Sequence, residues 1–519
     1  MLTIKEVSII KRLGLLFILI TAMFMTGCFG KKGEHEPNYS IIEIKTGEVY
    51  SPEIPTGKKV EIKFVNGDNK FVSITSKNGI VSSSENSTFY YTAPEIGKDD
   101  ILTLSYKDSA GIIKEMEYNI LLKSKITFLI YMGAQNSLGT SGFAAADLKE
   151  IKNSTISNIN KECNVLVYVD IDNEGNNGLY LYNQSETEGI KVNNELITGF
   201  KKLSYYGTGN TGIESELKNF LNYVYDNYSS DKYVLDLWSH GTGWRMDKSS
   251  SISKAIIVDD GSGDSLNMFE LTNAIEGSNL KKLDVIYFDA CLMGGIEVGY
   301  QLRNSTDYIV ASPEVTPGDG GEYGNILSKI NSEEVTTSYD ISKAIVDSNW
   351  EYYYDENENN EVNAVVYAIY DQSKIGKLLN ASENFFVKLT NENSIITKIK
   401  GKSNPILCYN NNGYNYNFDT IYVDYGDFLR VAAIYDTTIT TQVIQAQNAL
   451  NEYVVYLKKQ TGRYKKNGVM DNQYEDNSTG LSFYIDLASF SGTGYSEYKI
   501  ASDYGKLSWV QDFQNKLYY

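Results

Sequence analysis

Two residues with catalytic potential directly follow apolar segments of the sequence. In YVLDLWSHGTGW, His240 stands between an apolar run and a Gly-rich turn, and in LDVIYFDACLMGG, Cys291 has the same setting. Such runs are typical of strands buried in a parallel sheet, whose ligands bind beyond the carboxyl ends of the strands. A nucleophilic cysteine needs a base. Either residue alone is more commonly a packed core side chain, but together they predict a Cys/His dyad.

Metal and redox chemistry find little support in the remaining residues. The chain has two histidines and four cysteines, with no CxxC or HExxH pattern, which argues against a Cys/His zinc site. The predicted chemistry requires no cofactor. Calcium can be bound by carboxylates and carbonyls, which are present in the acidic segment 351–361 and around Asp259, Asp260 and Asp264, although no EF-hand spacing occurs.

The elements that must position His240 and Cys291 form an α/β pattern from about residue 124 to the end. Near-continuous apolar runs alternate with amphipathic segments; the runs are ITFLIYM, NVLVYVD, YVLDLW, AIIV, LDVIYFD and DYIVAS. A helix is predicted over IESELKNFLNYVYDNY, and another over NMFELTNAIEG, with Asn267 as its cap and Glu270 three residues on. The fold class is therefore α/β, a mostly parallel sheet flanked by helices.

A different pattern precedes this domain, from residue 38 to residue 123. Short alternating segments such as ILTLSYKD and EMEYNI are separated by turns, which predicts an antiparallel all-β sandwich. It resembles bacterial immunoglobulin-like spacer modules and carries no candidate chemistry.

The first residues predict export. Lys5, Lys11 and Arg12 accompany a short apolar run that ends in MTGC, which resembles a bacterial lipobox. Residues 1–27 are then a signal peptide, Cys28 the lipid-modified first residue, and 28–37 a polar tether. The protein is expected on the extracytoplasmic face of the cell membrane. An ordinary signal peptide cut near this point is the alternative.

Composition limits the partners. The 519 residues are 42% hydrophobic, which is typical of a folded chain, and 47 basic against 66 acidic residues give a net charge of −19. An acidic balance repels phosphate backbones, so nucleic acid is not an expected partner. A cationic peptide or a divalent cation suits the charge better.

The sequence around the two candidate residues resembles the clostripain-like cysteine peptidases. The matching blocks are His240-Gly241 and Asp289-Ala290-Cys291, together with YMGAQNSLGTSGFAAADLKEI and ASPEVTPGDGGEYG, and the resemblance runs from about residue 125 to the end. It implies a caspase-type fold and a cysteine endopeptidase that cleaves after Arg or Lys. The rival hypothesis is a non-catalytic adhesion or solute-binding lipoprotein that keeps the fold.

Roles follow for individual residues. Cys291 would be the nucleophile and His240 the general base, with the backbone N–H groups of Gly241 and Cys291 as oxyanion donors. Asp289 and Asp319 would hold the basic side chain of the substrate, and Glu314 and Glu322 are nearby acids with weaker claims. Strand periodicity places Asp289 and Cys291 on one face. The structural alternatives are that Asp289 caps the next helix and Asp319 stabilises a turn.

Self-cleavage is a further expectation. Relatives are often cut between the His-bearing and Cys-bearing parts, and the Ser-rich stretch RMDKSSSISKAIIVDDGSG lies between them here. Cleavage is expected between Lys254 and Ala255. Alternatively, Lys254 begins a strand whose pairing protects the bond.

Overall fold

The computed structural model describes residues 41–45, 52–65, 70–83, 88–154, 163–171, 176–205, 207–245, 256–332, 334–353, 365–391, 398, 406–409, 413–415, 422–459, 464–466, 469–471, 478–485, 498 and 501–518. The predicted signal peptide, Cys28, the tether, and the Lys254–Ala255 bond lie outside these residues.

The N-terminal part is built from two four-stranded sheets, with orders β1-β3-β6-β5 and β2-β8-β7-β4. Its strands are β1 (Ile41–Lys45), β2 (Glu53–Ile54), β3 (Lys59–Val65), β4 (Lys70–Ser76), β5 (Ile80–Ser83), β6 (Thr88–Thr92), β7 (Asp99–Lys107) and β8 (Ile113–Leu122). The predicted alternation holds in β7, where Leu102 and Leu104 enter a shared core. The sandwich is not purely antiparallel, because the short strands β1 and β2 pair in parallel with β3 and β8.

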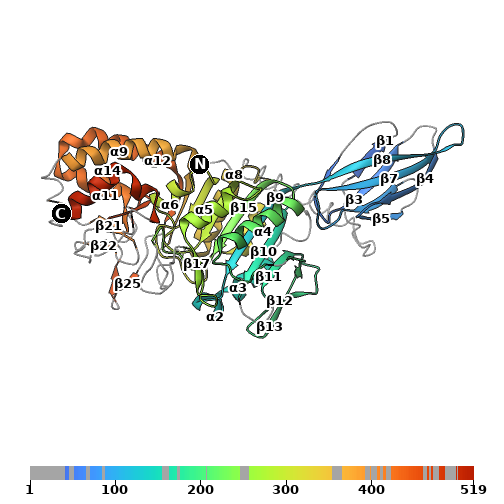
Figure 1. The fold of residues 1–519 in the computed structure, drawn as a ribbon, viewed down its shortest axis with the longest axis horizontal. Helices are drawn as coiled ribbons and strands as arrows, with labels where there is room; N and C mark the ends of the chain where they lie inside the picture. Colours follow the sequence, from blue (N-terminus) through green and yellow to red (C-terminus); the bar gives the residue numbers. More distant parts are fainter. Residues whose placement is uncertain are drawn as a thin grey trace, which may run out of the picture.

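One residue joins this part to the rest. β8 ends at Leu122 and β9 (Ser124–Gly133) begins after Lys123, whose Nζ lies 2.6 Å from Asp231 Oδ1. A buried hydrogen bond of 3.0 Å from Thr56 to Asn164 also crosses the junction. The two sheets therefore project from one end of the molecule on a continuous strand direction (Figure 1).

A nine-stranded sheet of order β14-β11-β10-β9-β15-β18-β19-β20-β24 forms the centre of the α/β part. Its remaining strands are β10 (Cys163–Asp170), β11 (Gly178–Tyr182), β14 (Phe200–Lys202), β15 (Ser230–Trp238), β18 (Leu283–Asp289), β19 (Thr306–Ala311), β20 (Val366–Asp371) and β24 (Val454–Lys459).

The sheet is mixed rather than mostly parallel. The five strands from β10 to β19 are parallel neighbours, as predicted, but β11, β14, β20 and β24 pair antiparallel at the two edges. The connection from β10 to β11 is too short for a crossover, so this pair must be antiparallel.

The apolar run AIIV does not join this sheet, contrary to expectation. β16 (Ile256–Asp259) pairs with β17 (Asp264–Leu266), with an irregularity at Ile257, which has a φ of 54°, and Ile256 forms an isolated antiparallel bridge with Gly241. A β-branched residue in this left-handed region is strained and interrupts a regular ladder. β16 begins at Ile256, two residues after the predicted cleavage bond.

Alternating side chains of the central strands bury two faces. On one face, Leu235 and Leu237 pack with α4, α5 and α6, and on the other, Val234 and Trp238 pack with α3, α7 and α8. The helices are α2 (Ser137–Thr140), α3 (Phe143–Asn153), α4 (Glu214–Asn227), α5 (Met268–Glu276), α6 (Ile296–Gln301), α7 (Tyr323–Ile330) and α8 (Ser338–Tyr353). Both predicted helices are confirmed as α4 and α5, and Asn267 and Glu270 form a reciprocal capping box.

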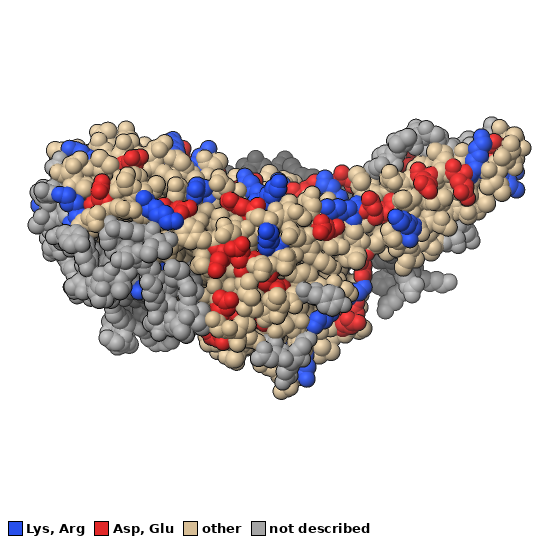
Figure 2. Space-filling view, in the orientation of Figure 1, with Lys and Arg blue, Asp and Glu red and all other residues tan. Residues whose placement is uncertain are grey.

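Helices near the C-terminus lie together at the end of the molecule opposite the N-terminal sheets (Figure 1). They are α9 (Ile375–Asn391), α11 (Tyr425–Tyr435), α12 (Thr440–Tyr453) and α14 (Ser508–Tyr518). Beside them lies a small sheet of β22 (Gly413–Asn415), β21 (Ile406–Cys408), β23 (Tyr422–Asp424) and β27 (Ser482–Tyr484). None of the described helices is long and apolar enough to span a membrane. Acidic and basic side chains are interspersed over the face in Figure 2.

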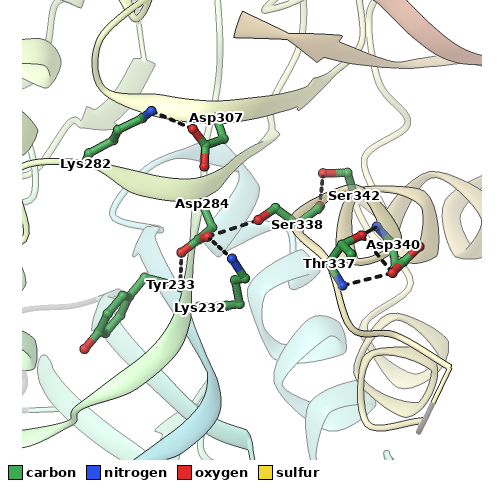
Figure 3. Close-up of polar contacts among 9 residues, drawn as sticks. All are labelled: Lys232, Tyr233, Lys282, Asp284, Asp307, Thr337, Ser338, Asp340 and Ser342. Atoms are coloured by element: carbon green, nitrogen blue, oxygen red, sulfur yellow. Dashed lines mark hydrogen bonds and ion pairs between the residues drawn. The ribbon is translucent and has the colours of Figure 1, made fainter. Parts of the chain in front are cut away.

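Ion pairs and hydrogen bonds around Asp284, at the start of β18, connect the elements at the amino ends of the central strands (Figure 3). Its carboxylate accepts from Lys232 Nζ at 2.9 Å, from the Tyr233 backbone N–H at 2.9 Å and from Ser338 Oγ at 3.0 Å. The three bonds link β15, β18 and α8. Lys282 and Asp307 form a neighbouring ion pair of 2.5 Å.

Candidate active site

His240 and Cys291 stand at corresponding positions beyond two adjacent strands. In the parallel register of β15 and β18, Trp238 is paired with Asp289, so each candidate lies two residues past the last paired position. The Ser239 backbone N–H continues this pairing to the Asp289 carbonyl at 3.4 Å. Both side chains are half-buried. The structure thus brings the two predicted residues to the same edge of the sheet.

Gly241 lies directly against the backbone of Cys291. A Cβ atom at position 241 would lie 2.5 Å from the Cys291 carbonyl oxygen, 2.9 Å from Ala290 Cβ and 3.2 Å from the Cys291 nitrogen. Real Cβ atoms do not approach a backbone oxygen so closely, so the position requires glycine. The two predicted oxyanion residues are therefore in contact through their main chains.

A hydrogen-bond network that sequence reasoning missed holds His240. Its Nε2 shares a hydrogen bond of 2.8 Å with Ser137 Oγ, at the start of α2. Asn136, which caps α2, donates from Nδ2 to Gly133 O at 2.8 Å, Val258 O at 2.8 Å and Ser239 Oγ at 3.1 Å. An Asn-Ser pair after a strand signals a helix start, but nothing local connects position 136 with position 239.

Cys291 is held by Thr316, in the loop that follows β19. The Thr316 backbone N–H donates to Sγ at 3.4 Å, and Thr316 Oγ1 lies 3.5 Å from Sγ. Burial raises the pKa of the Cys291 thiol, and the two Thr316 contacts offset part of that rise. Burial thus favours the protonated thiol over the thiolate, and a base beside it would assist its ionisation. The next residue, Leu292, has a φ of 62°, a strained conformation of the kind that clusters at functional sites.

The loop that follows β19 carries Asp319 and contacts Asp289, the last residue of β18. Asp289 is 5% exposed and accepts from the Gly321 backbone N–H at 2.9 Å. Burial raises its pKa to about 6. The helix-capping alternative for Asp289 is wrong, because α6 begins after Gly295 without a side-chain cap. Asp319 is exposed, one residue before Gly320, where an added Cβ atom would lie 2.8 Å from Asp289 Oδ2.

The predicted common face of Asp289 and Cys291 needs correction. β18 ends at Asp289, so the alternation does not extend to Cys291, which lies in a turn. Cys291 packs against the core of the α5 and α6 face, whereas Asp289 lies on the α3 and α7 face. The loop that carries Thr316 and Gly321 nevertheless contacts both residues.

Other predicted acids have structural partners. Glu314 is buried and accepts from the Val315 backbone N–H at 2.6 Å, and Glu322 caps α7 by accepting from the Asn325 backbone N–H at 2.7 Å.

The acids expected around a calcium ion lie on or beside the β16-β17 pair, where Asp259 is opposite Asp264. Asp259 accepts from Ser262 N at 2.9 Å, Asp264 accepts from Ser265 N at 2.8 Å, and Asp260 is exposed. Within the described ranges, no three His, Cys, Asp or Glu side chains gather to hold a metal ion. Most of the segment 351–361 lies outside those ranges.

A thiol and an imidazole thus share the carboxyl edge of a helix-flanked sheet. Residues 130–515 match the Clostripain family, and the chain belongs to this family. It is 26% identical to clostripain of Hathewaya histolytica over 458 residues, which cover 75% of this chain and 84% of clostripain. The protein is a cysteine endopeptidase, which favours the enzyme over the non-catalytic rival.

Solved structures share the fold. A secreted C11 cysteine protease of Bacteroides thetaiotaomicron, solved with an irreversible peptide inhibitor, matches with 21% identity and a TM-score of 0.55 over 75% of this chain and 99% of that one. An inactive zymogen C11 protease of Parabacteroides distasonis matches with 21% identity and a TM-score of 0.54 over 75% of this chain and 98% of that one.

Proposed function

We propose that this cysteine endopeptidase hydrolyses peptide bonds after Arg or Lys through a Cys291/His240 dyad, anchored to the cell membrane by lipid on Cys28. The observation that carries the dyad is the equal offset of His240 and Cys291 beyond the paired residues Trp238 and Asp289, with Gly241 packed on the Cys291 backbone.

The dyad works by nucleophilic catalysis. Cys291 Sγ forms a bond to the substrate carbonyl carbon while its proton passes to His240. The tetrahedral intermediate then expels the amine, which takes the proton from His240, and a thioester remains. Water attacks the thioester while losing a proton to His240, the carboxylic acid leaves, and the thiol is restored. The contact with Ser137 at Nε2 orients the imidazole for these transfers.

Backbone donors stabilise the intermediate. Its oxyanion accepts hydrogen bonds from the N–H groups of Gly241 and Cys291, whose main chains are in contact. Such preorganised donors commonly contribute 10²- to 10³-fold to turnover.

Acidic side chains give the preference for basic residues. Asp289 is a buried carboxylate two residues before the nucleophile, and Asp319 is an exposed one on the loop that contacts both Asp289 and Cys291. Carboxylates accept a guanidinium through parallel hydrogen bonds. The likeness to clostripain supports the same preference. Calcium dependence stays a prediction, and no step of the mechanism uses the ion.

Fluorogenic peptides with Arg, Lys, Asp or Asn before the cleaved bond test the proposal. We expect turnover after Arg and Lys, and none by Cys291→Ala or His240→Ala. Cys163→Ala is the matched control, because Cys163 is a half-buried thiol on β10 whose pKa burial raises to about 12. Substantial activity of His240→Ala would exclude the dyad, and no turnover by the wild type with calcium and reductant would exclude the activity.

Self-cleavage after Lys254 is part of the proposal. N-terminal sequencing of the wild type and of Cys291→Ala tests it, and we expect a new terminus at Ala255 only in the wild type. An uncut wild type with full activity would contradict a role for this cut in activation.

Membrane anchoring is tested separately. Labelling cells with a radioactive fatty acid should mark the wild type but not Cys28→Ser, which should be released from the membrane fraction. Equal labelling of both proteins would favour the ordinary signal peptide.

A further inference from the structure

Three buried aspartates gather beneath the site, and sequence analysis identified only one of them. Asp236 on β15 and Asp289 on β18 point to the same sheet face, and Asp147 comes from α3, which covers that face. Asp147 and Asp236 are 0% exposed and Asp289 is 5% exposed. These residues are here called the acid cluster.

Tyr323 links two members of the acid cluster. Its hydroxyl oxygen lies 2.6 Å from Asp236 Oδ2 and 3.0 Å from Asp289 Oδ2. A phenol has a single hydrogen to donate, so it satisfies one carboxylate at a time. If both contacts are hydrogen bonds, the other carboxyl group carries a proton and donates it to the tyrosine oxygen. The geometry therefore indicates a proton held between Asp236 and Asp289.

The remaining oxygens of the acid cluster lack partners. Asp147 accepts from Trp238 Nε1 at 2.5 Å through Oδ2, but Asp147 Oδ1 and Asp236 Oδ1 are buried with no hydrogen-bond donor among the described residues. None of the ion pairs formed within the described ranges involves these three side chains. A buried carboxylate is costly unless a cation or a proton balances it.

Among the residues that the structure describes, the titratable neighbours of the acid cluster are the Cys291 thiol and a set of acids and phenols. These acids and phenols are Glu150 on α3, Asp319 and Glu322 in the loop before α7, Tyr287 on β18, Tyr353 on α8 and Tyr367 on β20. Burial and the nearby carboxylates raise the pKa values of Asp147 and Asp236 strongly, although Trp238 offsets part of the rise for Asp147 and Tyr323 part of that for Asp236. Burial raises the pKa of Asp289 to about 6, with hydrogen bonds from Gly321 and Tyr323 opposing the rise. Asp289 accepts from both Gly321 and Tyr323, whereas Asp236 Oδ1 has no donor among the described residues, so the shared proton is assigned to Asp236.

We propose that the acid cluster exchanges a proton for the basic side chain of the substrate, with Asp236 releasing it while Asp289 binds the cation. This inference rests on the proposed preference for Arg or Lys. As the guanidinium or ammonium group enters, the Asp236 O–H bond breaks, the proton passes to solvent, and Tyr323 donates to the new carboxylate. Asp236 takes the proton back when the product leaves. Asp236 is a positioning residue, since it acts through Tyr323 and Asp289.

Proton release makes binding tighter as the pH rises. Below about pH 6, Asp289 is itself protonated and the acid cluster has no charge for the substrate. Above that pH, the released proton adds a second negative charge in the bound state. The KM for an Arg substrate should therefore continue to fall between pH 6 and pH 8.

Calorimetry counts the proton directly. A peptide with one Arg is titrated into Cys291→Ala protein at pH 7.5, in phosphate and in Tris, whose ionisation enthalpies differ. We expect release of about one proton per site. Binding without proton release overturns the inference and leaves the Arg preference intact, whereas no binding of the Arg peptide contradicts the proposed function itself.

The variant Asp236→Asn tests whether Asp236 is the group that releases the proton, since asparagine keeps the shape and the Tyr323 contact but cannot ionise. We expect proton release to be lost and the KM for the Arg peptide to rise about tenfold at pH 8 but little at pH 6, with kcat and iodoacetamide alkylation of Cys291 unchanged. Asp284→Asn, at the other end of β18, is the control and should release the proton as the wild type does. Release that persists in Asp236→Asn overturns the assignment.

Discussion

The two ends of β18 carry the same residue type in opposite electrostatic settings. At the amino end, Asp284 accepts from Lys232, Tyr233 and Ser338, so a cation balances its charge (Figure 3). At the carboxyl end, Asp289 meets a tyrosine hydroxyl that also contacts Asp236. A paired aspartate links structural elements, whereas an unbalanced one is available to a ligand.

This difference separates stability from function along a single strand. The amino edge of the sheet connects β15, β18 and α8 through satisfied groups. The carboxyl edge has the buried carboxylate of Asp289, with no cationic partner among the described residues, and strained residues such as Leu292. Both lower stability, and a bound cation would balance the carboxylate.

Among the variants at the two ends of β18, Asp289→Asn should have the largest effect, and that effect should be on cleavage after Arg. Asp289→Asn removes the buried charge that receives the guanidinium, and loss of one partner of such a pair costs about 2–5 kcal/mol. kcat/KM for an Arg substrate should fall by at least about 30-fold. Steady-state kinetics measures the loss, and alkylation of Cys291 by iodoacetamide should be unchanged. A parallel loss of alkylation would indicate that Asp289 supports the fold of the site instead.

Replacing the aspartate by asparagine should change the free energy of unfolding in opposite directions at the two ends of β18. The folded pKa of Asp289, about 6, exceeds its ordinary 3.8, so the folded state binds the proton more tightly and the free energy of unfolding falls as pH rises through this interval. At pH 7.5, Asp289→Asn should therefore raise the free energy of unfolding, by about 1–3 kcal/mol. Asp284→Asn should lower it by up to about 1 kcal/mol.

Denaturant titrations at pH 7.5 and pH 5 measure both changes. The gain in Asp289→Asn should shrink at pH 5, where the wild-type carboxyl is largely protonated. Destabilisation by Asp289→Asn at both pH values would show that this end of β18 is no less structural than the other.

The smallest effect is expected at Asp319. Its carboxylate is exposed, and exposed ion pairs contribute about 0.2–1 kcal/mol. Asp319→Asn should reduce kcat/KM after Arg by no more than about fivefold. Fluorogenic Arg and Lys peptides measure it, and the loss should be larger for Arg. An effect as large as that of Asp289→Asn would place the exposed acid at the centre of recognition.

Local sequence signals predicted the strand ends that carry His240 and Cys291, but not the residues from other elements that contact them. His240-Gly241 and Asp289-Ala290-Cys291 follow apolar runs, so the edge that they share was predictable from strand topology. Asp147, Asn136 and Tyr323 reach the site from separate elements, and no local pattern specifies such long-range contacts.

Apolar runs also do not state which sheet a strand joins. AIIV has the same composition as the central strands, yet β16 is held apart, with its Val258 N–H donating to Ser239 Oγ at 3.0 Å. The antiparallel edge strands were missed for a related reason, since pairing direction depends on the length and path of a connection rather than on composition.

The one-residue joint between β8 and β9 has a mechanical consequence. β9 is hydrogen-bonded to β10 over Cys163–Asp170 and to β15 along most of Ser230–Trp238. Tension applied along β8 enters β9 along its axis, so both ladders are loaded in shear and share the force instead of opening one bond at a time. The N-terminal sheets are thus attached to a central strand without a flexible linker at this junction. Their length therefore sets the distance between the site and the point where the N-terminal part is attached.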